Sequence, residues 1–352
     1  MEGRETEDDG LAKILTREGL WRLLERLSKR YLVYGPVARM SDFSFQEIVS
    51  AEDLRLDYPT TTIPPKKFFH HRQTLIEYSD RGFHASESPP EKRILLFGVH
   101  SCDLNAILRQ DRLFSRQLKD PYYLRLRRNS AVVAVTCTTV SGTCFCASLG
   151  TGPTIREGFD LLLTDLGGRF LVEVGSIEGR EMVGGLNLPE ATPSDFTEKE
   201  RRVEATLEKF EKKMNLDGLI EAALGSLNYE VWSMLGEKGG LAGCFPCLSC
   251  ANCSLVCPTC YCFEVADKPE LSLSRGVRVR ELDSCQNLEY AAVALGGNFR
   301  PDRRDRIRNW MMCKFGGGGG GVESGCVGCG RCIRSCPSHI DITEVARMLR
   351  GD

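Results

Sequence analysis

The chain has 352 residues, of which 42% are hydrophobic and 27% charged, and its formal net charge is −2. This length exceeds that of one small domain and predicts two or three. The near-neutral charge gives no reason to expect nucleic acid as a partner, and no apolar run is long enough to span a bilayer. Seventeen cysteines and an acidic start (MEGRETEDDG) without a signal peptide predict a reducing, anaerobic cytoplasm.

The first half of the chain predicts an α/β domain over residues 11–190, after a disordered tail at 1–10. Leucines at helical spacing predict a helix over 11–27, and residues 31–37 predict a strand that ends at the turn Gly35-Pro36.

The centre of this domain has the pattern of a βαβ unit. A strand (RILLFGV, 93–99), a helix (103–114) and a second strand (AVVAVT, 131–136) follow one another. This order favours a mainly parallel sheet. Residues 159–164 and 170–174 predict two more strands that form a hairpin.

A change to helical periodicity predicts a connector over residues 191–240. Thr197 and Glu200 have the spacing of a capping box at the start of its first helix, and a second helix is predicted over 217–235. We expect these helices to pack without carrying chemistry.

One cysteine pattern, C-x2-C-x2-C-x3-C-P, occurs twice near the end of the chain. It is the ligand spacing of two-cluster ferredoxins, in which the fourth Cys binds the other cluster. Two [4Fe-4S] clusters are therefore predicted. A zinc site would not require the third and fourth Cys of each motif. The predicted ligands are Cys247, Cys250, Cys253 and Cys336 for the first cluster, and Cys326, Cys329, Cys332 and Cys257 for the second.

Both motifs lie in a predicted C-terminal domain, residues 241–352. Helical patterns at 283–295, 301–313 and 342–349 favour an α-helical ferredoxin-like fold. Arg303, Arg304 and Arg306 are expected on a solvated basic face that could attract an acidic partner.

Four further cysteines are expected at one edge of the α/β sheet. Cys102 and Cys137 directly follow the two strands of the βαβ unit, and Cys144 and Cys146 lie in the next loop. Open α/β sheets place ligands at this edge. A third [4Fe-4S] cluster is the favoured interpretation, while zinc or four buried, unliganded thiols remain alternatives.

A last group of cysteines surrounds the first motif. Cys260 and Cys262 resemble a chelating pair, and Cys285 with Cys313 could complete a fourth site, with Cys244 as an alternative ligand. Cysteines that merely pack near the clusters are an equally good interpretation.

The blocks RILLFGVHSCDLNAI, CFCASLGTGP, GFDLLLTDLGGRFLVEVGS and CLSCANCSLVCPTCYCF resemble the family that comprises sulfhydrogenase (nickel–iron hydrogenase) β subunits and the A-type subunits of anaerobic sulfite reductases. The resemblance implies an iron–sulfur electron carrier within a multi-subunit cytoplasmic enzyme. It also implies a flavin subunit that handles a nicotinamide cofactor and a separate catalytic subunit. Cys313 stands where the family pattern leads us to expect His.

Motifs for nucleotide binding are missing, since the sequence has neither G-x-G-x-x-G after a strand nor a P-loop. In agreement with this absence, the resemblance implies a non-catalytic electron-transfer subunit, without catalytic residues, that relays electrons between a flavin subunit or ferredoxin and a catalytic subunit. The alternative is a sulfur or polysulfide reductase that uses an open-site cluster at the Cys102 group.

Overall fold

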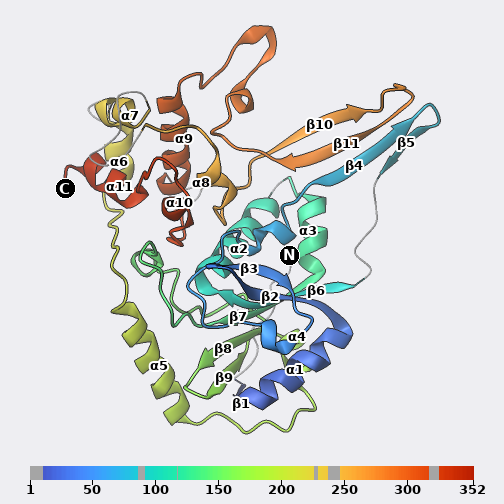
Figure 1. Ribbon diagram of the computed structural model, residues 1–352, viewed down its shortest axis with the longest axis vertical. Helices are drawn as coiled ribbons and strands as arrows, with labels where there is room; N and C mark the ends of the chain where they lie inside the picture. Colours follow the sequence, from blue (N-terminus) through green and yellow to red (C-terminus); the bar gives the residue numbers. More distant parts are fainter. Residues whose placement is uncertain (1–10, 86–91, 117, 226–228, 237–245, 317–324) are drawn as a thin grey trace. The chain divides into compact units, whose positions relative to one another are not determined.

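The computed structural model describes residues 11–85, 92–116, 118–225, 229–236, 246–316 and 325–352 (Figure 1). The predicted tail at 1–10 and Cys244 lie outside these ranges. The chain divides into two compact units. The first consists of Met1–Lys66, Pro90–Lys213 and Val327–Gly330, and the second of Lys67–Pro89, Met214–Cys326 and Arg331–Asp352. None of the described helices is both long and apolar enough to cross a bilayer.

The first unit is built on a sheet with the strand order β1-β9-β8-β7-β6-β2-β3. The neighbours β2 and β6, β6 and β7, and β7 and β8 are parallel, whereas the pairs toward the edges are antiparallel. The predicted mixed α/β fold with a mostly parallel sheet is therefore confirmed. Its strands are β1 (Ala12–Thr16), β2 (Tyr31–Arg39), β3 (Asp42–Glu47), β6 (Arg93–His100), β7 (Ser130–Val135), β8 (Leu161–Asp165) and β9 (Arg169–Val174).

Helices follow or flank these strands: α1 (Arg17–Arg30), α2 (Ser101–Phe114), α3 (Pro121–Arg128), α4 (Ile177–Val183) and α5 (Pro193–Leu207). In α1, four leucines at helical spacing are buried against the sheet. The core beneath them includes Leu95, Val133, Leu161 and Val172, each with no exposed surface. Burial of these side chains is what holds the sheet and α1 together.

Two predicted elements near the start are wrong in detail. Residues 12–16 form β1, which pairs with β9, and the helix begins only after Thr16, whose hydroxyl accepts a hydrogen bond from Gly19 N at 3.1 Å. The predicted turn at Gly35-Pro36 is also wrong, because β2 continues through both residues and pairs with β3.

The capping box of α5 lies five residues earlier than predicted. Thr192 is the N-cap, and its backbone N donates to Asp195 Oδ2 at 2.8 Å. Pro193 then occupies the first helical position, where its missing N–H costs nothing. The second connector helix is not continuous, since the structure contains α6 (Leu219–Leu224) and α7 (Tyr229–Gly236).

A buried ion pair joins α2 to α3. Arg127 Nε donates to Asp111 Oδ2 at 3.0 Å, and Tyr123 Oη donates to Asp111 Oδ1 at 2.8 Å. Removing one partner of such a pair leaves a buried charge without compensation. We therefore expect Asp111→Ala to lower the free energy of unfolding by about 3–5 kcal/mol. Asp111→Asn, which keeps the acceptor for Tyr123, should cost less. Urea denaturation followed by circular dichroism measures both, and equal midpoints for the three proteins would contradict the prediction.

The second unit contains a four-stranded antiparallel sheet with the order β10-β11-β4-β5, which forms a long ribbon (Figure 1). Its strands are β4 (Gln73–Ser79), β5 (Gly82–Ala85), β10 (Phe263–Pro269) and β11 (Arg275–Leu282). Besides α6 and α7, its helices are α8 (Asn252–Leu255), α9 (Arg303–Phe315), α10 (Arg331–Arg334) and α11 (Ile342–Arg350).

The predicted helices near residues 301–313 and 342–349 correspond to α9 and α11. The helix predicted over 283–295 is wrong, because this segment holds only the short 3₁₀ turns Glu289–Ala291 and Ala294–Gly296. Residues 263–282, for which no element was predicted, form the hairpin of β10 and β11.

Candidate metal centres

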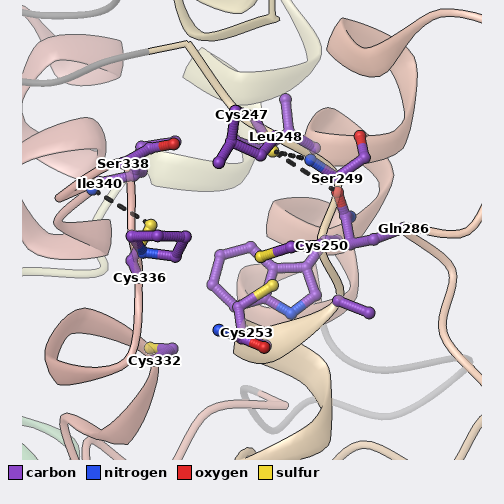
Figure 2. A pocket seen from close by; sticks show the side chains of 15 residues that line it. Cys247, Leu248, Ser249, Cys250, Cys253, Gln286, Cys332, Cys336, Ser338 and Ile340 are labelled. Atoms are coloured by element: carbon purple, nitrogen blue, oxygen red, sulfur yellow. Dashed lines mark hydrogen bonds between the residues drawn. The ribbon is translucent and has the colours of Figure 1, made fainter.

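The first predicted set of ligands surrounds one pocket in the second unit (Figure 2). Cys247, Cys250 and Cys253 from the first motif line it together with Cys336 from the second. Cys336 and Cys332 lie on one side and Cys250 and Cys253 on the other. The structure thus brings together the four residues that the crossover rule of two-cluster ferredoxins selects. It also places Cys332, predicted to bind the second cluster, at the same pocket.

Two short helices position these cysteines in an equivalent way. Cys253 lies on α8 and Cys332 on α10, and each helix is followed by the fourth Cys of its motif. Asn252 Nδ2 donates to Ser335 O at 3.3 Å, which links the two helices. Contacts between segments about 80 residues apart therefore hold Cys336 beside the first motif.

Backbone N–H groups point at two of the sulfurs. Ser249 N donates to Cys247 Sγ and Ile340 N to Cys336 Sγ, both at 3.4 Å (Figure 2). Ser249 and Ala251 have φ angles of 52° and 65°, so the loop alternates its backbone in the manner of an anion-binding nest. Hydrogen bonds of this kind stabilise negative charge on thiolate ligands.

The chemistry of the donor set fits a metal cluster. Burial raises the pKa of the Cys247 and Cys253 thiols, and the neighbouring thiols, including Cys336 and Cys250, raise it further. Such a group stabilises thiolates only when a cation compensates their mutual repulsion, as iron does. Within the described ranges, no three Cys, His, Asp or Glu side chains are arranged to hold a single metal ion.

Several residues at this pocket were not predicted from the sequence. Gln286, Ile307 and Trp310 line it. Arg306, predicted on a solvated face, is instead buried, with an exposed fraction of 6%. Its guanidinium donates to Ser249 Oγ at 3.3 Å and to the carbonyl oxygens of Arg300 and Pro301, at 3.0 and 2.6 Å. Arg306 therefore supports the loop of the first motif and is removed from the proposed basic face.

The second predicted set is distributed over both units. Cys257, Cys326 and Cys332 belong to the second unit, and Cys329 to the segment Val327–Gly330 of the first. Within the second unit, Thr259 Oγ1 lies 3.2 Å from Cys257 Sγ and donates to Gly325 O at 2.6 Å. This contact holds the end of the first motif beside the residue that precedes Cys326. Cluster binding by this set stays a prediction.

The third predicted set converges in the first unit. Cys102 lies in the first turn of α2, directly after β6, and Cys137 follows β7, the parallel neighbour of β6. Cys102, Cys144 and Cys146 are buried in one cluster of side chains. Burial, followed by the proximity of Cys102 and Cys144, raises the pKa of the Cys137 thiol. All four predicted ligands therefore lie together at the expected sheet edge.

A piece of the second motif completes this group. Phe145 N donates to Gly328 O and Thr151 Oγ1 to Val327 O, both at 2.8 Å. Gly328 has a φ of +64°, and a Cβ there would lie 2.6 Å from Cys146 Cα, so only glycine fits. Cys329 consequently packs in the same buried cluster as Cys102, Cys144 and Cys146. Its approach to the third set was not predicted.

The four described cysteines of the fourth predicted set all lie near the ammonium of Lys314. Lys314 lowers the pKa of Cys262 and acts in the same direction on Cys285, and Cys260 and Cys313 raise the pKa of Lys314 itself. Metal binding by this set stays a prediction. Lys314 is 2% exposed, and its Nζ donates to Thr259 Oγ1 at 3.1 Å.

Comparisons with known proteins support [4Fe-4S] clusters in the C-terminal part of the chain. Residues 246–340 match a family model described as a 4Fe-4S dicluster domain. The chain is 37% identical over 332 residues to sulfhydrogenase 2 subunit beta of Pyrococcus furiosus, an alignment that covers 92% of this chain and 94% of that protein. None of the solved structures matches the chain significantly.

Proposed function

Because the chain belongs to the family of sulfhydrogenase β subunits, we propose that it is the iron–sulfur electron-transfer subunit of a multi-subunit oxidoreductase. In this role it relays electrons between a flavin subunit or a ferredoxin and a separate catalytic subunit of hydrogenase or sulfite reductase type, in the cytoplasm. The observation that carries the proposal is the pocket formed by Cys247, Cys250, Cys253 and Cys336, whose ligands come from both motifs.

The residues of the pocket each have a task in this proposal. The four thiolates bind a [4Fe-4S] cluster, which accepts and returns single electrons. The N–H groups of Ser249 and Ile340 stabilise the sulfur charge, and the apolar side chains of Ile307 and Trp310 limit the access of water. Low dielectric and hydrogen bonds to sulfur are the means by which a protein sets the potential of such a cluster.

A second cluster on Cys326, Cys329, Cys332 and Cys257, and a third on Cys102, Cys137, Cys144 and Cys146, complete the proposed assignment. The packing of Cys329 against the third set supports an electron path, because it holds a ligand of the second cluster beside the ligands of the third. In this assignment, each of the three predicted clusters has another predicted cluster next to it on the electron path.

The alternative, a sulfur or polysulfide reductase with an open-site cluster at the Cys102 group, receives less support. Cys102, Cys144 and Cys146 are all buried, with exposed fractions of 6–9%, which gives a substrate little direct access.

Anaerobically purified chain tests the proposed function. We expect iron and acid-labile sulfide, bleaching of the visible absorption by dithionite, and no bound flavin. The isolated chain should not oxidise hydrogen or turn over polysulfide with reduced viologen. Polysulfide turnover that disappears in a Cys102→Ser variant would favour the alternative, and an iron-free chain would refute both.

A further inference from the structure

Strand β10 forms one edge of the ribbon in the second unit, and β5 forms the other (Figure 1). β5 has four residues, whereas β10 has seven, all of which except Ala266 are exposed. Within the described ranges, no strand pairs with the outer side of β10. An edge of this length presents a row of backbone groups to which a further strand can add.

The hydrogen bonds to β11 determine which backbone groups of β10 face outward. At one end of the strand, Asp283 N donates to Cys262 O at 3.1 Å, and at the other end Glu270 N donates to the first carbonyl oxygen of β11 at 2.9 Å. The register between these points has no bulge. Every second residue from Cys262 to Glu270 therefore faces β11, and the N–H and C=O groups of Val265 and Asp267 point away from the sheet.

The side chains of β10 carry a charge that their own sheet leaves without a partner. Glu264 is directly opposite Glu281 of β11, and like charges at such positions destabilise a pair of strands. Lys268, on the same face of β10 as Glu264, forms an ion pair with Glu281. Among the described residues, the other ion pair of β10 joins Asp267 to Arg278, and none involves Glu264. Glu264 thus lies beside a like charge.

A second copy of β10 supplies the opposite charge that Glu264 lacks. When two β10 strands run antiparallel with Ala266 opposite Ala266, Glu264 of each copy lies opposite Lys268 of the other. Val265 of one copy and Asp267 of the other then exchange N–H···O bonds through their outward-facing groups. Glu264 and Lys268 occupy the non-hydrogen-bonded positions of this ladder, where paired Cα atoms are only about 4.5 Å apart.

The neighbouring registers are less complementary. A pairing centred on Val265 keeps the backbone hydrogen bonds but places Glu264 opposite Ala266. A pairing centred on Asp267 places this carboxylate opposite its own copy, and it aligns Val265 with Pro269, which has no N–H to donate. Charge complementarity therefore selects the register centred on Ala266.

We propose that the outer edge of β10 pairs with the same edge of a second copy of this chain, so that two ribbons join into one continuous antiparallel sheet. The interface is isologous, because both copies contribute the same strand around a twofold axis. A second copy fits this edge because the charges of β10 are complementary to the same strand in reverse. The proposal concerns assembly and does not rest on the proposed electron-transfer function.

The first test is sedimentation equilibrium of the full chain, purified anaerobically with its iron, over a range of concentrations. We expect a dimer for the parent protein. Glu264→Lys should raise the dimer dissociation constant about tenfold or more, because both symmetry-related pairs become repulsive. Lys268→Glu should have the same effect. The double variant Glu264→Lys, Lys268→Glu restores opposite charges across the interface and should return the dissociation constant toward that of the parent.

A second pair of variants tests the backbone hydrogen bonds. Val265→Pro removes an N–H that points outward and leaves the bonds to β11 in place, so it should abolish the dimer. Val265→Ala keeps this N–H and is the matched control, which should dimerise as the parent does. Circular dichroism and iron content report whether each variant is folded.

Two results would overturn the proposed pairing. A parent protein that remains monomeric over the whole concentration range would leave the edge of β10 to a different chain. A dimer that is as stable in Glu264→Lys or in Val265→Pro as in the parent would show that the copies meet elsewhere. Neither result would affect the proposed electron-transfer function, which the iron content and dithionite bleaching of the same samples test separately.

Discussion

A Cys336→Ser variant is expected to lose the cluster of the first motif, although Cys336 belongs to the second motif in the sequence. The physical reason is the pocket, in which Cys336 faces Cys250 and Cys253 (Figure 2). Loss of one thiolate of four should release about four irons per chain or leave an incomplete cluster. Iron analysis and electron paramagnetic resonance of the dithionite-reduced protein measure the effect.

The identity of the lost cluster follows from comparison with two further variants. Cys250→Ser removes a ligand that lies in the first motif itself, and it should lose the same spectral component as Cys336→Ser. Cys326→Ser should lose a different component. Ser335→Ala, next to Cys336 in the chain, is the control and should retain all of the iron. If Cys336→Ser instead matched Cys326→Ser, the crossover of ligands would be refuted.

The ligand sets were predictable because their information is local. Each motif places its cysteines at fixed short spacings, and the strand pattern around Cys102 and Cys137 placed both at one sheet edge. Burial on both faces makes such strands continuous apolar runs, which are readily recognised. The structure supports the convergence of these residues, while the binding of clusters by them stays a prediction.

The hairpin of β10 and β11 was not predicted, because it lacks a clear local sequence pattern. Nearly every side chain of β10 is exposed, and neither face of the strand is apolar throughout its length. Its partner β11 buries only Gly276, Val279 and Arg280. Strand prediction depends on one buried face, which this hairpin lacks over most of its length.

Residues that support the sites were missed because their roles arise from long-range contacts. Gln286 meets Cys247, and Arg306 meets Ser249, across 39 and 57 positions of the chain. An arginine in a run of arginines predicts a solvated face, and only the fold shows that this guanidinium binds backbone carbonyls.

Replacement of Cys102 and Cys137 together is expected to lower the iron content from about twelve to about eight atoms per chain. The two residues follow neighbouring parallel strands, and their thiols lie close enough for Cys102 to raise the pKa of Cys137. Because a [4Fe-4S] cluster requires four ligands, a double Cys102→Ser, Cys137→Ser variant cannot retain it.

The control for this variant is Thr139→Ala, which lies in the same loop and accepts from Cys137 Sγ only through its backbone oxygen, at 3.1 Å. It should keep all of the iron. Zinc is measured in the same samples, since zinc that fell in place of iron would identify a different metal at the same thiols. An iron content near eight in both the parent and the double variant would confine the clusters to the two ferredoxin motifs. The α/β domain would then be a scaffold, and the electron path through Cys329 would end at the second cluster.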